Sequence, residues 1–309
     1  MEKGIDNKVA VIAGGTGLIG RSLVPMLLNE GYRVKLLTRN PKKVQKSGIN
    51  VDIVEWSGKP DSELTVLLEG ADVVINLSGY SIATLWTKRN RKRIVDSRIL
   101  PTRALAQAIA SCRKTPKVFV QASAVGVYPY SSNSVLTEKS AVGNGFLPAL
   151  VSDWENEALA CAYVTRVILL RTGIVLASDG GYFPKIAKPI RYFAGAILGD
   201  GKNIVPWIHI ADHVRAIKFL IDNSAASGAF NLTAPTTNSN ADIVFQVAHH
   251  YRRPILFRIP SIILHLLPGN MANEVLLANQ PVYPERLTQL GFSWNLPVLE
   301  NAIADLLAK

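Results

Sequence analysis

Short apolar runs alternate with amphipathic segments along the first 176 residues of the chain. Each apolar run is long enough for a buried strand, and each following segment has apolar residues at helical spacing. The runs that predict strands are 8–13, 33–38, 50–56, 71–79, 117–122 and 166–176. The segments that predict helices are 18–31, 61–69, 89–113 and 146–162. This alternation predicts an α/β fold, a doubly wound parallel sheet of the Rossmann type.

Two prolines conflict with this pattern. Pro25 falls inside the first helix and should bend it. Pro101 should break or restart the helix predicted over 89–113, near Leu100.

The regular alternation of predicted strands and helices ends after about residue 177. A basic, aromatic helix is predicted within 180–201, short strands at 203–210 and 228–234, and further helices at 211–223, 238–251, 261–279, 284–290 and 297–308. We therefore expect a Rossmann domain over 1–175 and a smaller, mainly helical carboxyl-terminal substrate lobe over 176–309. The two are interleaved, because 211–234 is predicted to return to the sheet.

Composition narrows the class of protein. With 309 residues, 48% hydrophobic and 18% charged, the chain can bury a large core and has little scope for long disorder. Cys112 and Cys161 have neither disulfide-framework nor metal-ligand spacing, so no metal site is predicted and a reducing compartment fits best. No stretch approaches the ~20 apolar residues of a membrane span. The cytoplasm and an organelle, with any presequence absent, both stay open.

The formal net charge of +11 needs an explanation, and the basic residues gather at 33–46, 88–98, 113–117 and 252–258. Such charge suits nucleic acid, an anionic membrane face, an acidic partner or a cofactor with several phosphates. Nucleic acid is not expected, because no recognition motif or aromatic interleaving accompanies the charge. Cofactor attraction and a solvated surface are favoured, and docking of an anionic protein partner comes second.

A glycine-rich turn lies between the first predicted strand and helix. Gly14, Gly17 and Gly20 form G-x-x-G-x-x-G, a spacing variant of the dinucleotide-binding loop. Its glycines permit the tight turn, the approach of backbone amides to a pyrophosphate and the close packing of helix on strand. The free amides at the helix start face the phosphates. The candidate anion-binding residues are Gly14, Thr16, Gly17, Leu18, Ile19 and Gly20.

The end of the second predicted strand bears on the choice between NAD and NADP. An acidic residue there would bind the ribose hydroxyls of NAD, whereas this chain has Thr38 and Arg39. A guanidinium matches the 2′-phosphate of NADP in charge and shape, so NADP is favoured. The alternative is that Arg39 belongs to a solvated turn.

Several motifs together resemble one family. In chain order they are the loop 14–20, Asn76-Leu77-Ser78-Gly79, Ser97-Arg98, Ser123-Ala124-Val125-Gly126, Trp154-Glu155, and segments 171–176, 206–212 and 231–235. The chain resembles, over essentially its whole length, the extended short-chain dehydrogenase/reductases of the NAD-dependent epimerase/dehydratase superfamily. Within these it is similar to the atypical, epimerase-like SDR39U subfamily.

This resemblance implies NADP as cofactor and a cleft between the two lobes. Thr38 and Arg39 would hold the adenosine phosphate. Leu77 and Ser78, with Gly79 at the same strand end, would line the dinucleotide, and Arg98 and Val175 would contact it further along. Trp207 and His209 would lie at the cleft edge; the alternative is a buried tryptophan and a structural histidine.

The superfamily's catalytic Tyr-x-x-x-Lys pair is absent. There is no tyrosine between 131 and 162 and no lysine between 140 and 184. Ser123 and Tyr128 are the candidate substitutes that could hydrogen-bond a substrate carbonyl, and Asp153 or Glu155 could serve as an acid if burial raised its pKa. A structural role is the alternative for each.

Two functions follow from these observations. The first is an NADP(H)-dependent oxidoreductase or epimerase acting on a small carbonyl or sugar-like substrate. The second is a non-catalytic NADP-binding scaffold or redox-sensing subunit that docks an anionic partner. The missing pair and the charge favour the second, whereas the substrate lobe favours the first.

Overall fold

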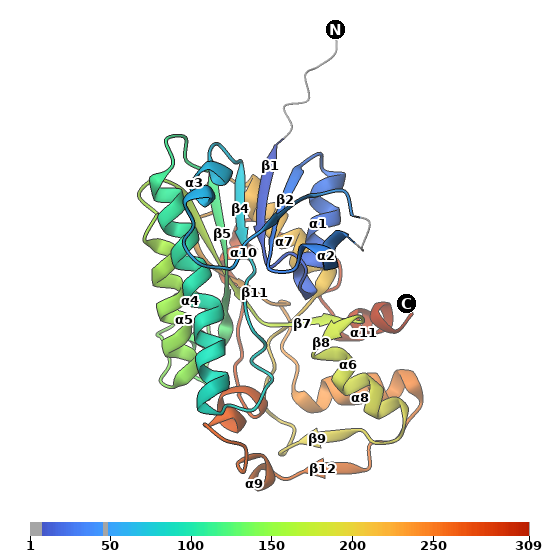
Figure 1. Ribbon diagram of the computed structural model, residues 1–309. Coiled ribbons are helices and arrows are strands. Elements are labelled where there is room, and N and C mark those ends of the chain that lie inside the picture. The colour runs from blue at the N-terminus through green and yellow to red at the C-terminus, as the bar shows by residue number, and fades with distance from the viewer. Residues whose placement is uncertain (1–7, 46–48, 309) are drawn as a thin grey trace.

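A seven-stranded parallel sheet forms the centre of the computed structural model, which describes residues 8–45 and 49–308 (Figure 1). The spatial order of its strands is β11 (Gly228–Leu232), β6 (Arg166–Thr172), β5 (Val118–Ala124), β4 (Val73–Asn76), β1 (Val9–Ala13), β2 (Arg33–Thr38) and β3 (Asp52–Glu55). The Rossmann fold class is thereby confirmed.

The strand order reverses direction between β1 and β4. From β1 the chain adds β2 and β3 on one side and then returns to add β4 on the other. Ala13, the last residue of β1, pairs with Leu37 on β2 and with Asn76 on β4. A crevice at the carboxyl ends of the strands, at such a reversal, is where open parallel sheets bind ligands.

Helices cover both faces of this sheet (Figure 1). One face packs against α1 (Leu18–Asn29) and α7 (Ile210–Asp222), and the other against α3 (Ser62–Leu68), α4 (Lys88–Ser111) and α5 (Phe146–Leu159). Successive residues of β1 enter different cores: Ile12 joins the α1 side and Val11 the α3 side. Because both faces are buried, the strands are continuous apolar runs.

The second region contains two small sheets and several short helices. The sheets are β10 (Trp207–His209) with β7 (Ile174–Ala177) and β8 (Gly180–Gly181), and β12 (Phe257–Ile259) with β9 (Ala196–Leu198). The remaining helices are α2 (Pro41–Gln45), α6 (Phe183–Arg191), α8 (Asn240–Tyr251), α9 (Ser261–Leu264), α10 (Glu285–Gln289) and α11 (Leu299–Leu307), with a 3-10 turn η1 (Val125–Val127) and a π-helical turn η2 (Ala272–Leu276).

Three expectations about these elements were wrong. Helix α4 continues through Pro101, which is buried, so tertiary packing outweighs the missing backbone donor. The strand predicted over 166–176 is two strands, because the chain changes sheets at Gly173, where a Cβ atom would lie 2.7 Å from the Pro206 carbonyl oxygen. The helix predicted over 261–279 is only α9 and the turn η2, which are separated by the Pro268-Gly269 break.

The carboxyl-terminal region supplies hydrogen bonds that the Rossmann elements need. The carboxylate of Glu274 on η2 accepts from the amides of Phe146 and Leu147 at the start of α5. The buried carboxylate of Asp212 on α7 accepts from the amides of Asn295 and Leu296. The last third of the chain therefore supplies hydrogen bonds to helices that come earlier in the sequence.

Within the described residues, no helix has the length and apolarity that crossing a membrane demands.

Candidate functional site

The glycine-rich turn lies against the end of β4. Gly14 has φ of +76°, and a Cβ atom there would lie 2.6 Å from the carbonyl carbon of Leu77. The amide of Gly17 donates to the carbonyl of Gly14 over 3.0 Å and closes the turn. At Gly20, a Cβ atom would lie 2.3 Å from the carbonyl oxygen of Gly15. Positions 14 and 20 therefore require glycine, because a Cβ atom there would collide with backbone atoms, which cannot move aside.

The first turn of α1 lies beyond the carboxyl end of β1 and has open backbone donors. Its N-cap is Gly17, which offers no side-chain acceptor, and Thr16 and Gly17 are exposed while Leu18 and Ile19 are half-buried. The unpaired amides and the positive end of the helix dipole together favour an anion at this position.

A hairpin from the second region closes over the same helix start. Asp179, between β7 and β8, pairs with Arg21 of α1 through an N–O distance of 2.9 Å. Cβ atoms on Gly180 and Gly181 would lie 3.1 and 2.8 Å from the methyl carbons of Leu18. Sequence reasoning missed this contact, although the Asp-Gly-Gly turn was visible. Val175 lies buried on β7, the strand that leads into this hairpin.

Thr38 and Arg39 follow directly from β2. Thr38 is half-buried and its hydroxyl accepts from the amide of Asn40, whereas Arg39 is exposed. The hydroxyl shapes the turn after the strand. The guanidinium of Arg39 is accessible beside the sheet edge where the crevice begins.

A half-buried cation on α4 lies over the end of β4. Ser78 is oriented by its amide, which donates to the Asn76 side chain, and Gly79 is exposed. The guanidinium of Arg98 lies over Gly79, donates to the carbonyls of Tyr80 and Ile94, and stacks 5.2 Å from the Trp154 ring. Burial lowers the pKa of Arg98 to about 10, so it remains charged at neutral pH.

Among the described residues, no carboxylate forms an ion pair with Arg98. A half-buried guanidinium whose charge is not balanced by a carboxylate can donate hydrogen bonds to a bound anion. Together with the α1 amides, it fits the donor set that a dinucleotide needs.

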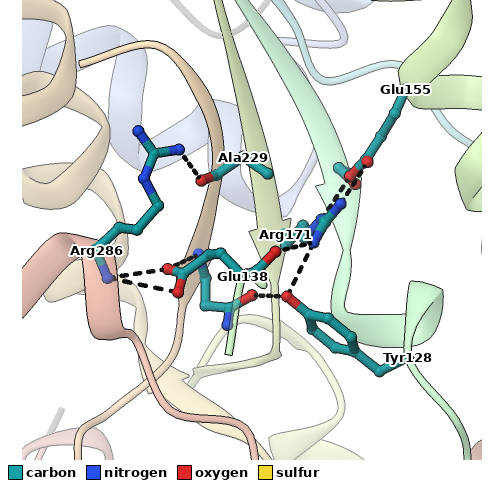
Figure 2. Close-up of polar contacts among 8 residues, drawn as sticks. Tyr128, Glu138, Glu155, Arg171, Ala229 and Arg286 are labelled. Atoms are coloured by element: carbon teal, nitrogen blue, oxygen red, sulfur yellow. Dashed lines mark hydrogen bonds and ion pairs between the residues drawn. The ribbon is translucent and has the colours of Figure 1, made fainter. Parts of the chain in front are cut away.

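Ser123 lies behind the crevice in a buried ion-pair network. Its hydroxyl donates to Glu155 over 2.5 Å, and both oxygens of that carboxylate accept from Arg171, at 2.9 and 2.8 Å (Figure 2). Glu155 and Arg171 are both nearly buried. The paired hydrogen bonds fix the carboxylate, which in turn holds the serine hydroxyl in place.

Tyr128 belongs to the same network. Its hydroxyl donates to the Asn231 side chain over 2.7 Å and accepts from Arg171 over 3.0 Å (Figure 2). Burial raises the pKa of Tyr128. Both candidate catalytic hydroxyls thus have protein partners, a geometry typical of a structural role.

The network continues to the carboxyl-terminal region through Glu138. One oxygen of its carboxylate accepts from the amide of Asn231 over 2.9 Å, and both face the amide of Arg286 (Figure 2). Burial raises the pKa of Glu138. The side chain of Arg286 donates to the carbonyl of Ala229 over 2.6 Å. Sequence reasoning missed Glu138, Asn231 and Arg286, because nothing in their local spacing links them.

The face of α5 toward η1 is apolar. Leu147 lies 3.5 Å from the position of a Cβ on Gly126, and Val151, one turn later, packs with Val125 and Val127. Asp153 is exposed on another side of the helix. Against η1, α5 therefore places Leu147 and Val151, and its acid Glu155 lies one turn beyond Val151, where it is bonded to Ser123 and Arg171.

Trp207 and His209 are both buried. The Trp207 ring donates to the Asn238 side chain over 2.9 Å. The Nδ1 atom of His209 accepts from the amide of Ala211, so Nε2 carries the proton, 3.2 Å from the Asp305 carboxylate. These contacts match the structural interpretation of the pair.

His213, on the next turn of α7, predicts a pH dependence of stability. It is fully buried, with Nε2 3.0 Å from the Thr172 hydroxyl, and burial lowers its pKa from 6.5 to about 3. Below about pH 6.5 the imidazole is protonated in the unfolded state but stays neutral in the folded state. The free energy of unfolding therefore falls as pH falls. Between pH 7.5 and 5.5, His213 should contribute about 1.4 kcal/mol of this loss.

Urea denaturation of wild type and His213→Leu at both pH values checks this expectation. The variant should lose that part of the pH dependence, whereas substituting Gln for the exposed His249 should leave it unchanged. Equal pH dependence in wild type and His213→Leu would contradict a buried neutral imidazole.

Metal-ligating side chains do not gather in the described structure: it holds no group of three or more His, Cys, Asp or Glu residues that could bind an ion.

Comparisons with known proteins agree with this geometry. Residues 10–233 match the NAD dependent epimerase/dehydratase family, and residues 259–306 match a domain of unknown function, DUF1731. An epimerase family protein of Staphylococcus haemolyticus is 36% identical over 302 residues, which cover 97% of this chain and 99% of that protein. One of Mycobacterium leprae is 32% identical over 299 residues, covering 96% and 94%.

Two solved structures have similar folds. The human epimerase family protein SDR39U1, isoform 2, crystallised with NADPH, is 27% identical with a TM-score of 0.85, and the match covers 96% of this chain and 98% of that one. The nucleoside-diphosphate sugar epimerase of Corynebacterium glutamicum is 29% identical with a TM-score of 0.78, and the match covers 98% of this chain and 59% of that one.

Proposed function

Because this chain belongs to the NAD-dependent epimerase/dehydratase family and is epimerase-like in the manner of SDR39U1, we propose that it binds NADP(H) in the crevice between β1 and β4. We further propose that it acts as an oxidoreductase or epimerase on a small carbonyl or sugar-like substrate. In this proposal residues 1–175, with 211–234, hold the cofactor, and the rest of 176–309 mostly holds the substrate.

The observation that carries the proposal is the arrangement of donors around the crevice. The open amides at the start of α1, which follows β1, and the half-buried guanidinium of Arg98 on α4, which lies over Gly79 after β4, are on two sides of it. Arg39 is exposed at the end of β2, where a carboxylate would favour NAD. The NADPH bound by the similar human protein supports the choice of NADP.

The chain's own residues would bind and orient the cofactor. The α1 amides would bind the pyrophosphate, Arg98 would neutralise charge further along, and Arg39 would bind the 2′-phosphate. The hairpin at Asp179, held by Arg21, would keep water from the phosphates. When bound, the nicotinamide supplies or accepts a hydride. Ser123 and Tyr128 remain candidates for holding a substrate oxygen, although each hydroxyl already has protein partners.

Substituting Ala for Arg39 should weaken NADPH binding by about tenfold or more, because a charge-assisted contact to phosphate contributes about 1.5–3 kcal/mol. Binding of NADH, which lacks the 2′-phosphate, should change little. Calorimetric titration of wild type and variant with both cofactors measures the difference. Lys59→Ala, another exposed cation, is the control. NADH binding as tight as NADPH, with Arg39→Ala altering neither, would refute the phosphate assignment.

A second function is favoured by the apolar face of α5. With Leu147 and Val151 on that face and Ser123 and Tyr128 engaged elsewhere, the chain could bind NADP(H) without turning it over, as a scaffold or redox-sensing subunit. A screen of carbonyl and sugar substrates for NADPH oxidation separates the two functions. Tight NADPH binding without turnover on any substrate supports the scaffold, whereas turnover supports the enzyme.

A further inference from the structure

An exposed apolar surface lies at the end of the molecule farthest from the described amino terminus, where β12 and α9 are found (Figure 1). Leu266 is 82% exposed and Ile262 74%. We call this surface the apolar tip, and its members are Leu256, Phe257, Ile262, Ile263 and Leu266. Several large apolar side chains exposed to this extent in one short stretch of chain mark a candidate interaction surface.

Residues next to the apolar tip pack into the protein core. Leu264, between the exposed residues of α9, is buried, and Leu267 packs into a core cluster with Trp86 and Met271. A Cβ atom on Gly269 would lie 3.0 Å from Trp86, directly before α4. The tip therefore lies beside the start of α4, although the two are far apart in sequence.

The start of α4 places cations beside the apolar tip. Five of its first six residues are basic, and no acidic residue occurs in 79–95 or in 252–273. Within the described residues, only one of the five forms an ion pair, Lys92 with Asp96. We call these the basic flank: Lys88, Arg89, Arg91, Lys92 and Arg93. Such charges oppose the helix dipole at an N-terminus, so they do not serve helix stability.

Exposed aliphatic side chains with cations beside them match the chemistry of an anionic lipid surface. The apolar side chains can enter the acyl boundary while lysine and arginine contact the phosphates. An acidic polypeptide, which would use the basic flank, is an outcome that the test below distinguishes. We propose that the apolar tip and the basic flank dock this protein peripherally on anionic lipid bilayers. This proposal is independent of the cofactor and of any turnover.

Co-sedimentation of the full-length protein with lipid vesicles tests the proposal. Binding is expected to vesicles of phosphatidylcholine mixed with phosphatidylglycerol, to weaken as salt rises, and to be much weaker with phosphatidylcholine alone. Ile262→Asp should reduce binding more than tenfold, because it removes an aliphatic side chain that would enter the bilayer and adds a charge that anionic lipids repel. Lys88→Ala with Arg89→Ala should reduce binding roughly 25-fold, at about fivefold per cation.

Matched controls lie at the other end of the molecule. Val66 on α3 is 77% exposed, so Val66→Asp should leave vesicle binding unchanged. Lys59→Ala with Lys114→Ala removes two other exposed cations and should have little effect. Urea denaturation of every variant provides a readout of folding that does not depend on the cofactor.

Three results would overturn the proposal. The first is binding to neutral and anionic vesicles with equal affinity, or to neither. The second is self-association in the absence of lipid that Ile262→Asp abolishes, which assigns the tip to a second copy of the chain. The third is binding to an acidic polypeptide that depends on Lys88 and Arg89 while vesicle binding does not, which assigns the flank to a protein partner.

Discussion

Replacing Arg171 by methionine is expected to lower the free energy of unfolding by about 3–5 kcal/mol, because it leaves the buried carboxylate of Glu155 without its countercharge. Methionine retains much of the side-chain volume, so the loss reports charge pairing more than packing. Urea denaturation at neutral pH measures it.

A second carboxylate on α5, the helix that carries Glu155, offers a matched control. Arg103 pairs with Glu157, two residues beyond Glu155, but Arg103 is exposed to solvent. Arg103→Met should therefore change stability very little. A double variant, Arg171→Met with Glu155→Leu, should recover much of the loss because no buried charge remains. Equal stability of Arg171→Met and Arg103→Met would contradict the assignment of Glu155 as a buried charge that depends on Arg171.

Placing alanine at Gly20 is expected to weaken NADPH binding more than tenfold and to destabilise the fold by about 1–3 kcal/mol. The added methyl would lie within 2.4 Å of three backbone atoms of Gly15, and backbone cannot move aside as a side chain can. The start of α1 must then separate from the turn, so its amides lose their aim at the pyrophosphate. Calorimetric titration with NADPH and urea denaturation measure the two effects.

Gly31→Ala is the control for Gly20→Ala. Gly31 has φ of +79°, so alanine is strained by about 1–2 kcal/mol, but nothing lies within 4 Å of the new methyl. Stability should fall while NADPH affinity stays at the wild-type level. Unchanged NADPH affinity in Gly20→Ala would show that the turn does not hold the cofactor.

The strands and helices were predictable where local pattern and tertiary packing agree. Buried on both faces, β1 reads as an apolar run, and the turn after it is marked by glycines that the backbone requires. Pro101 illustrates the opposite case, because its burial within α4 depends on packing that no local rule contains. The change of sheet at Gly173 likewise depends on Pro206, a neighbour only in the folded chain.

The polar network was less predictable than the glycine-rich turn. Ser123 and Tyr128 were identified as candidate hydroxyls, but their partners come from distant segments: Asn231 is 103 residues beyond Tyr128. A binding loop is encoded by consecutive residues, whereas a buried network is encoded by the fold. Sequence spacing therefore indicated which hydroxyls were available and could not indicate that the protein already uses them.

The way residues 259–306 are bonded to the earlier part of the chain limits how such proteins can diversify. Glu274 caps α5, and the amides of Asn295 and Leu296 complete the coordination of Asp212 on α7. A recombination event that exchanged only this terminal stretch between two ancestral genes would strip both helices of those bonds unless the incoming stretch restored them. The two matched regions should therefore be inherited together, and new specificities should arise by point substitution more readily than by shuffling.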